Sequence, residues 1–153
     1  MRNSIIIRLE NTLFNTSNIS SHLPAAKDRK RYLAAALPKC RINPAFVEPL
    51  ALLGPLWSIG KPVSVSIVTG FLGEVLWKLL SANGLAGARI FQSAERAIGE
   101  AGGNSVLIST DPGDLKAAEM AGVPASGDIS SQEAVLGALG LRKAASGAEH
   151  RAA

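Results

Sequence analysis

The feature that most constrains the fold is a short apolar run, Ser4–Leu9, which is rich in isoleucine and ends in polar turn-forming residues. Runs of β-branched residues bounded by turn formers are typical of strands that are buried on both faces. Two later runs, Pro62–Thr69 and Ser105–Ser109, have the same character, and a stretch with helical periodicity follows each of them. Strands that alternate with helices predict an α/β fold, a doubly wound parallel sheet with helices on both faces.

Helical periodicity and capping residues predict where the helices lie. The expected helices are Ala25–Leu37, Asn43 to about Leu56, Gly70 to about Ala82, Arg89–Ala101, Pro112–Ala121 and Ser131–Leu141. Asp111 precedes a proline, which is the pattern of a helix N-cap with proline in the first position, and it places Asp114 in the third position. Helix capping alone is therefore one explanation for both aspartates.

The chain length of 153 residues suits one compact domain. We expect residues 1–143 to form it and residues 144–153 to be a flexible tail. Prolines and charged residues interrupt the apolar region between residues 46 and 80, so no membrane span is expected. The N-terminal apolar run is too short for a signal peptide, which favours a cytoplasmic location. A single cysteine, Cys40, excludes an internal disulfide.

Basic residues gather in one segment of a chain whose formal net charge is +4. They are Lys27, Arg29, Lys30, Arg31, Lys39 and Arg41. A solvated helix face is the simpler interpretation, because aromatic residues do not alternate with these charges beyond Tyr32. Nucleic-acid binding through the Lys27–Arg41 segment is the alternative.

The first strand and the turn after it resemble the first motif of the haloacid dehalogenase superfamily. That family has an apolar strand followed by Asp-x-Asp-Gly-Thr-Leu, and the same frame here is IIIRLENTL. Arg8 stands at the position of the nucleophile, Glu10 at that of the general acid and Asn11 at that of the glycine, while Thr12 matches.

Two later segments resemble further motifs of the same family in the same order. SIVTGFLGEVL resembles the second motif through Thr69, and VLISTDPGDLKAAEMAGVPA resembles the fourth, with Asp114 retained. Ser109 and Thr110 replace the Gly-Asp of that motif, and the third-motif lysine has no counterpart except Arg89. The resemblance covers most of residues 4–125, and it implies an α/β core of that family in which residues 17–61 are a reduced helical insertion in place of the cap.

The resemblance implies that catalysis needs an anionic oxygen at position 8, both for attack on phosphorus and for coordination of Mg²⁺. The guanidinium of Arg8 has no lone pair for either role and stays protonated. At an effective dielectric constant of about 20, a unit charge about 4 Å from a divalent cation is repelled by roughly 8 kcal/mol. We therefore expect no catalytic residue, no metal and no cofactor, and we hypothesise that Arg8 forms an internal ion pair with Asp111 or Asp114 in place of the metal.

Three functions remain open at this level. The leading hypothesis is a non-catalytic pseudo-phosphatase that acts as a binding, regulatory or assembly module. A divergent Mg²⁺-dependent phosphatase or hydrolase that uses Glu10, Asp111 or Asp114 is the enzyme alternative, and nucleic-acid binding is the third. Arg8, Thr12, Thr69 and Gly70 are the candidate ligands for a small phosphate or carboxylate. The apolar Ala51–Ile59 region favours a homodimer or another protein partner.

Overall fold

A computed structural model describes residues 4–17, 19, 26–51, 64–71, 74–85, 87–102 and 104–140. Five parallel strands form the main sheet, in the order β5-β4-β1-β6-β7. The strands are β1 (Ser4–Arg8), β4 (Ser64–Val68), β5 (Arg89–Phe91), β6 (Ser105–Ile108) and β7 (Ala125–Ser126). The predicted parallel sheet is confirmed.

The central strand β1 is buried on both faces, which explains its run of isoleucines. Ile5 and Ile7 pack into one apolar cluster and Ile6 into another, because successive side chains of a strand point to opposite faces. All three are fully buried, and each such side chain contributes about 1.5–3 kcal/mol of hydrophobic stabilisation. A polar residue in this run would therefore face a helix layer whichever way it pointed.

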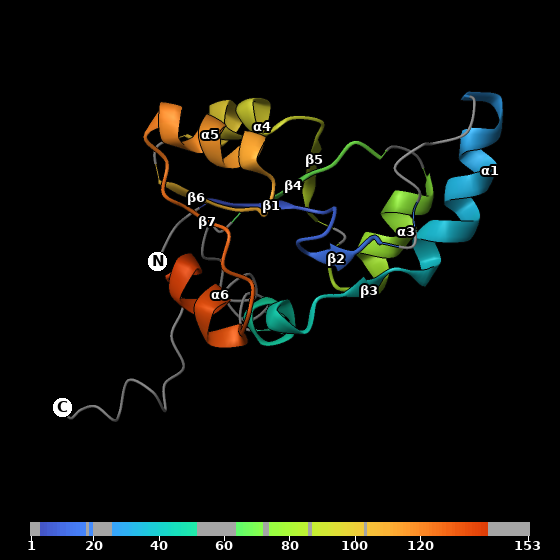
Figure 1. The fold of residues 1–153 in the computed structure, drawn as a ribbon, viewed down its shortest axis with the longest axis horizontal. Coiled ribbons are helices and arrows are strands. Elements are labelled where there is room, and N and C mark those ends of the chain that lie inside the picture. The colour runs from blue at the N-terminus through green and yellow to red at the C-terminus, as the bar shows by residue number, and fades with distance from the viewer. Residues whose placement is uncertain are drawn as a thin grey trace.

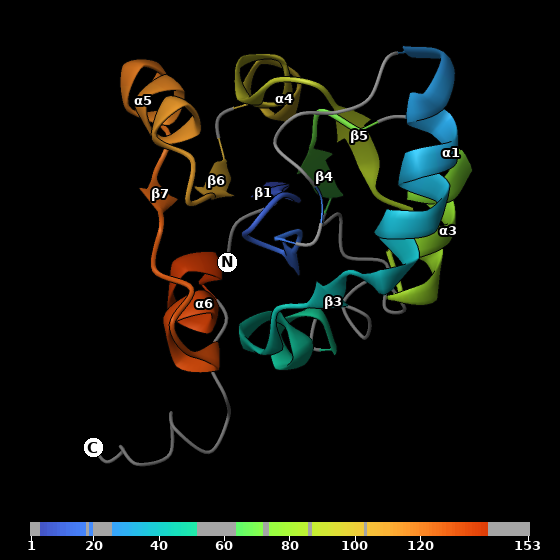
Figure 2. The same ribbon diagram turned by 45° about the vertical axis from the view of Figure 1, so that its right-hand side comes forward.

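Helices cover both faces of the sheet, as Figures 1 and 2 show. One face is covered by α4 (Ala94–Ala101) and α5 (Pro112–Ala121). The other face packs against α3 (Glu74–Ala82), α6 (Gln132–Leu139) and the short 3₁₀ helix η2 (Pro44–Phe46). The core is thus divided by the sheet into two apolar layers, as in other doubly wound folds.

A second, two-stranded sheet follows the first turn. It pairs β2 (Phe14–Asn15) antiparallel with β3 (Arg41–Ile42), and α1 (Ala26–Ala36) and the 3₁₀ helix η1 (Leu37–Lys39) lie between them in the chain. Because β2 and β3 are paired, the segment between them begins and ends at adjacent points of the molecule. Leu33 and Leu37 belong to the same apolar cluster as β1 and α3, so this segment extends the main core. The expected division into a domain of residues 1–143 with a 17–61 insertion stays a prediction.

The helix termini follow their capping residues closely. Asp111 caps α5 by accepting a hydrogen bond from the backbone N–H of Gly113 at 2.9 Å, with Pro112 in the first position as predicted. Ser93 and Ser131 cap α4 and α6 in the same way, through the N–H groups three residues further on. The polar residues that closely follow β5 and β6, Ser93 and Asp111, therefore also begin the next helix.

One predicted helix was wrong at its start. Residues Arg89–Phe91 were expected to be helical but form β5, because they pair with β4 from Ser66 to Val68 and the N-cap at Ser93 starts α4 only afterwards. The strands β2, β3 and β7 were not predicted, since two residues are too few to show a period. The end of the helix expected to reach Leu56, and the 144–153 tail, lie outside the described residues. Among the described helices, none is long and apolar enough to cross a membrane.

Candidate functional site

Polar side chains meet where the three central strands end. Arg8 pairs with Val68 across β1 and β4, and Ile7 pairs with Ile108 across β1 and β6, so the strands end at one level. The residues that follow them, including Thr69 and Ser109, consequently lie beside the first turn. This carboxyl edge is where parallel sheets usually hold ligands.

An ion pair occupies the centre of this edge. The guanidinium of Arg8 donates from Nε to Oδ2 of Asp114 and from Nη2 to Oδ1 of Asp114, both at 2.6 Å. This is the bidentate geometry in which a planar guanidinium matches a carboxylate. Only 14% of the Arg8 side chain and 6% of the Asp114 side chain are exposed, so solvent screens the pair weakly. The predicted contact between these two residues is present.

Two further carboxylates flank the guanidinium of Arg8. Oε1 of Glu10 lies 3.5 Å from Nη1, and Oδ2 of Asp111 lies 3.5 Å from Nη2. The hydrogen bonds to Asp114 raise the pKa of Arg8 above its ordinary value and outweigh the opposing effect of burial, and the charges of all three acids add to the rise. Arg8 is therefore a fixed positive charge.

Ser109 holds the carboxylate of Asp114 in place. Its buried hydroxyl donates to Oδ2 of Asp114 at 2.7 Å and accepts from the backbone N–H of Asp111 at 3.0 Å. Asp114 thus accepts hydrogen bonds from two side chains besides standing in the first turn of α5, and its role exceeds capping. Sequence reasoning recognised Ser109 only as a departure from the family motif and did not predict this contact. A serine two residues before an Asp-Pro helix start was the available signal.

Glu10 occupies the donors that were predicted to bind an external anion. Its Oε2 accepts from the backbone N–H of Gly70 at 2.8 Å and from the hydroxyl of Thr69 at 3.1 Å. Oε1 accepts no hydrogen bond within the described part of the chain and faces only Arg8. The carboxylate of Glu10 therefore lies where the N–H and hydroxyl groups of a strand-to-helix turn would otherwise receive a phosphate or carboxylate.

Thr12 links the first turn to the turn before α5. Its buried hydroxyl accepts from the backbone N–H of Thr110 at 3.1 Å and lies 3.0 Å from the Thr110 hydroxyl. The Thr12 hydroxyl, one of the groups considered for anion binding, thus contacts the turn before α5. Asn11 reaches φ +52°, a left-handed conformation that asparagine tolerates well. This explains how Asn11 can stand where the family motif has glycine.

The formal charges at this edge leave an excess of negative charge. The carboxyl-edge cluster, defined here as Arg8, Glu10, Asp111 and Asp114, holds one cation and three carboxylates. An entering anion would meet a formal net charge of −2, and its candidate donors already have partners. Arg8, Thr12, Thr69 and Gly70 lie around this edge, but their donors are turned toward groups of the chain itself.

The residues of the cluster do not fit Mg²⁺. Both carboxylate oxygens of Asp114 are held by the guanidinium of Arg8, which would lie beside any cation bound there. In the described part of the chain, no three His, Cys, Asp or Glu side chains are placed to hold a metal ion together. Glu10, Asp111 and Asp114 are thus gathered around Arg8 in an arrangement that suits a guanidinium.

Arg89, the cation considered for the third-motif lysine, lies away from the cluster. It begins β5 opposite Ser66, at the amino end of the pairing with β4. Its Nη2 is 3.3 Å from Oε1 of Glu100, and its guanidinium carbon lies 5.2 Å from the ring centre of Phe91. Arg89 therefore supplies no charge to the carboxyl edge.

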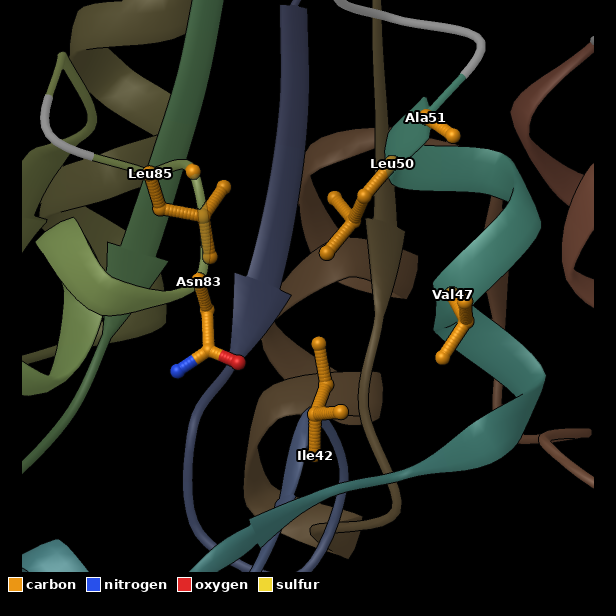
Figure 3. Close-up of a pocket in the computed structure, with 7 residues that line it drawn as sticks. Ile42, Val47, Leu50, Ala51, Asn83 and Leu85 are labelled. Carbon is orange, nitrogen blue, oxygen red and sulfur yellow. The ribbon is translucent and has the colours of Figure 1, made fainter.

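A hollow of about 440 Å³ lies elsewhere, between the helical residues 47–51 and the loop after α3 (Figure 3). Its lining residues are Ile42, Val47, Leu50, Ala51, Asn83, Gly84 and Leu85. The lining is mainly apolar, and the amide of Asn83 donates to the backbone oxygen of Leu79 at 2.8 Å. The hollow contains no ionisable side chain among these residues, so it offers no catalytic group. The dimer contact expected over Ala51–Ile59 lies largely outside the described residues.

Comparison with known proteins finds similarity in structure alone. No protein-family model matches the chain, and no curated protein matches it. A hydrolase from Streptococcus pneumoniae TIGR4 superposes with a TM-score of 0.60 at 12% sequence identity, over 92% of this chain and 99% of the other. A haloacid dehalogenase-like family hydrolase from Streptococcus pneumoniae has a TM-score of 0.45 at 12% identity, over 89% and 90% of the two chains. The first likeness shows that the chain has the fold of a hydrolase over nearly its whole length.

Proposed function

We propose that this chain is a non-catalytic member of the haloacid dehalogenase superfamily that serves as a binding, regulatory or assembly module. The observation that carries the proposal is the bidentate ion pair between Arg8 and Asp114 at the carboxyl edge of the sheet. Motif order in the sequence and the hydrolase fold support the superfamily, and the ion pair supports the loss of its chemistry.

The nucleophile is the first requirement that the cluster does not meet. Arg8 ends the central strand at the position of the attacking aspartate in the resemblance, and its side chain offers only N–H donors. Glu10 has an oxygen free of hydrogen bonds among the described residues, yet that oxygen faces Arg8. An attack by Glu10 would require its carboxylate to leave Gly70, Thr69 and Arg8 together.

In the rest of the cluster, side chains of the protein take the places that a metal ion and a phosphate would fill. The guanidinium of Arg8 neutralises the carboxylate of Asp114, as a bound divalent cation would. The carboxylate of Glu10 accepts hydrogen bonds from the N–H of Gly70 and the hydroxyl of Thr69, as a phosphate oxygen would. The site is closed by its own side chains, and we infer that its role is structural.

Phosphatase assays on three forms of the protein test this proposal. Wild type, Arg8→Asp and Glu10→Gln are assayed with p-nitrophenyl phosphate, with and without Mg²⁺, after circular dichroism has shown that each is folded. We expect wild type to show no Mg²⁺-dependent turnover above buffer. Turnover by wild type that Glu10→Gln abolishes would instead establish the divergent hydrolase.

Thermal unfolding gives a second readout that does not depend on activity. The Arg8→Asp variant places a fourth carboxylate at the cluster and removes its cation, so Mg²⁺ should raise its melting temperature. Mg²⁺ should leave the melting temperature of wild type unchanged, because Arg8 already holds Asp114. An equal rise in both proteins would contradict the role that we give to Arg8.

A further inference from the structure

The positive charge of the chain is concentrated in one segment. Residues 26–41, here called the α1 segment, hold six basic residues and one acidic residue, which is a net charge of +5. The whole chain has a net charge of +4, so the remaining residues together carry −1. The segment that links β2 to β3 is thus basic, and the rest of the molecule is nearly neutral.

The charged side chains of this segment that the structure describes are exposed. Leu33, Leu37 and Cys40 of the α1 segment are buried, whereas Arg31, Lys39 and Arg41 are exposed. Figures 1 and 2 both show α1 at the outer edge of the molecule beside α3. The described side chains of the segment that are exposed are charged residues, alanines and a proline: Asp28, Arg29, Arg31, Ala34, Ala35, Pro38, Lys39 and Arg41.

This surface favours one kind of partner over two others. A membrane-bound amphipathic helix inserts an apolar face into lipid, but the apolar residues of the α1 segment, Leu33 and Leu37, are already used in the core. A protein interface draws most of its affinity from large apolar or aromatic side chains, and the described exposed residues of the segment include none. A nucleic-acid backbone needs only regularly spaced cations to neutralise its phosphates.

We propose that the α1 segment binds nucleic acid through backbone phosphates, with Arg31, Lys39 and Arg41 among the contacting residues. Binding is expected to be independent of base sequence, because phosphate contacts carry no base information. The proposal depends on the exposed charges of the segment and holds whether or not the carboxyl-edge cluster is catalytic. The insertion between β2 and β3 then provides the binding surface of the module.

Fluorescence anisotropy with a labelled DNA duplex and an RNA duplex, at rising KCl concentration, tests the proposal. If two to four phosphates are neutralised, the logarithm of the association constant should fall against the logarithm of salt with a slope of about −2 to −4. The double variant Arg31→Glu/Lys39→Glu should bind at least about tenfold more weakly than wild type. Both residues are exposed, so the variant is expected to fold, and circular dichroism checks that it does.

A matched control carries the same change of net charge elsewhere. Arg96→Glu/Lys116→Glu alters two exposed residues on α4 and α5, which cover the other face of the sheet. At about 150 mM salt the Debye length is about 8 Å, so this variant should bind nearly as wild type does. Absence of binding to both duplexes, an equal loss in the control, or binding of phosphatidylserine vesicles without binding of nucleic acid would each overturn the proposal.

Discussion

The chain has two groups of charged residues in opposite environments, one buried and paired and the other exposed. In the carboxyl-edge cluster, the guanidinium of Arg8 is held by Asp114 and flanked by two further carboxylates. In the α1 segment, Arg31, Lys39 and Arg41 are exposed on an outer helix and the elements that follow it. The number of charges in a region therefore does not show whether they can bind anything. Burial and pairing decide which charges remain available to a partner.

The largest expected effect comes from removing one half of the buried ion pair. Asp114→Ala leaves Arg8 charged and largely buried without its main partner, which should lower the free energy of unfolding by about 3–5 kcal/mol. Urea denaturation measures the loss. Glu119→Ala removes an exposed carboxylate from the same helix and is the control. A loss in Asp114→Ala no larger than that in Glu119→Ala would show that the pair is not important for stability.

Removing both halves should be milder than removing one. The double variant Arg8→Met/Asp114→Leu replaces the pair by apolar side chains, and we expect it to be more stable than Asp114→Ala by at least about 2 kcal/mol. A complete double-mutant cycle, measured by urea denaturation, isolates the interaction between the two residues. Strictly additive losses in this cycle would mean that Arg8 and Asp114 act independently.

A smaller effect concerns the anion donors that Glu10 occupies. Glu10→Ala releases the N–H of Gly70 and the hydroxyl of Thr69 and lowers the formal negative charge of the cluster by one. The variant should therefore bind inorganic phosphate about tenfold more tightly than wild type, a difference of about 1.4 kcal/mol. Isothermal titration calorimetry measures the change, and Glu133→Ala, at an exposed position in α6, is the control. Equal affinities in wild type and Glu10→Ala would show that Glu10 does not block the donors.

The smallest expected effects are those of pH. The pKa of Arg8 is raised, so its contribution to stability is fully present below the unfolded pKa and is lost only as strongly alkaline pH passes the folded pKa. The pKa of Asp128 is lowered by hydrogen bonds from the hydroxyl and N–H of Ser130, so its contribution is lost as the pH falls through the folded pKa. Arg8 should thus add no slope near neutral pH.

Thermal unfolding of Asp128→Asn beside wild type checks the acid side. The melting temperatures should differ slightly above about pH 4 and converge below it, because the carboxylate of Asp128 is then protonated in both states. Ser130→Ala should show the same trend, since it removes the hydroxyl that donates to Asp128. Curves that diverge further as the pH falls would contradict this assignment.

The sequence predicted the helices of several turns and the strands with a long apolar run. Ser4–Arg8, Ser64–Val68 and Ser105–Ile108 were predicted within a residue or two, because burial on both faces requires a continuous apolar run. It misassigned Arg89–Phe91, whose strand exists only through pairing with β4. It also anticipated the contact between Arg8 and Asp114 but not the support from Ser109, which depends on where the turn before α5 places a hydroxyl.

The sequence by itself determined the three longest strands of the sheet, the N-cap of α5 at Asp111 and the presence of a cation where the resembling family has a nucleophile. These properties follow from local patterns of apolar, turn-forming and capping residues. The tertiary structure decided that Arg8 meets Asp114 and that Glu10 meets Gly70 and Thr69. These properties depend on contacts between residues about 60 or more positions apart along the chain, and no local pattern encodes such contacts.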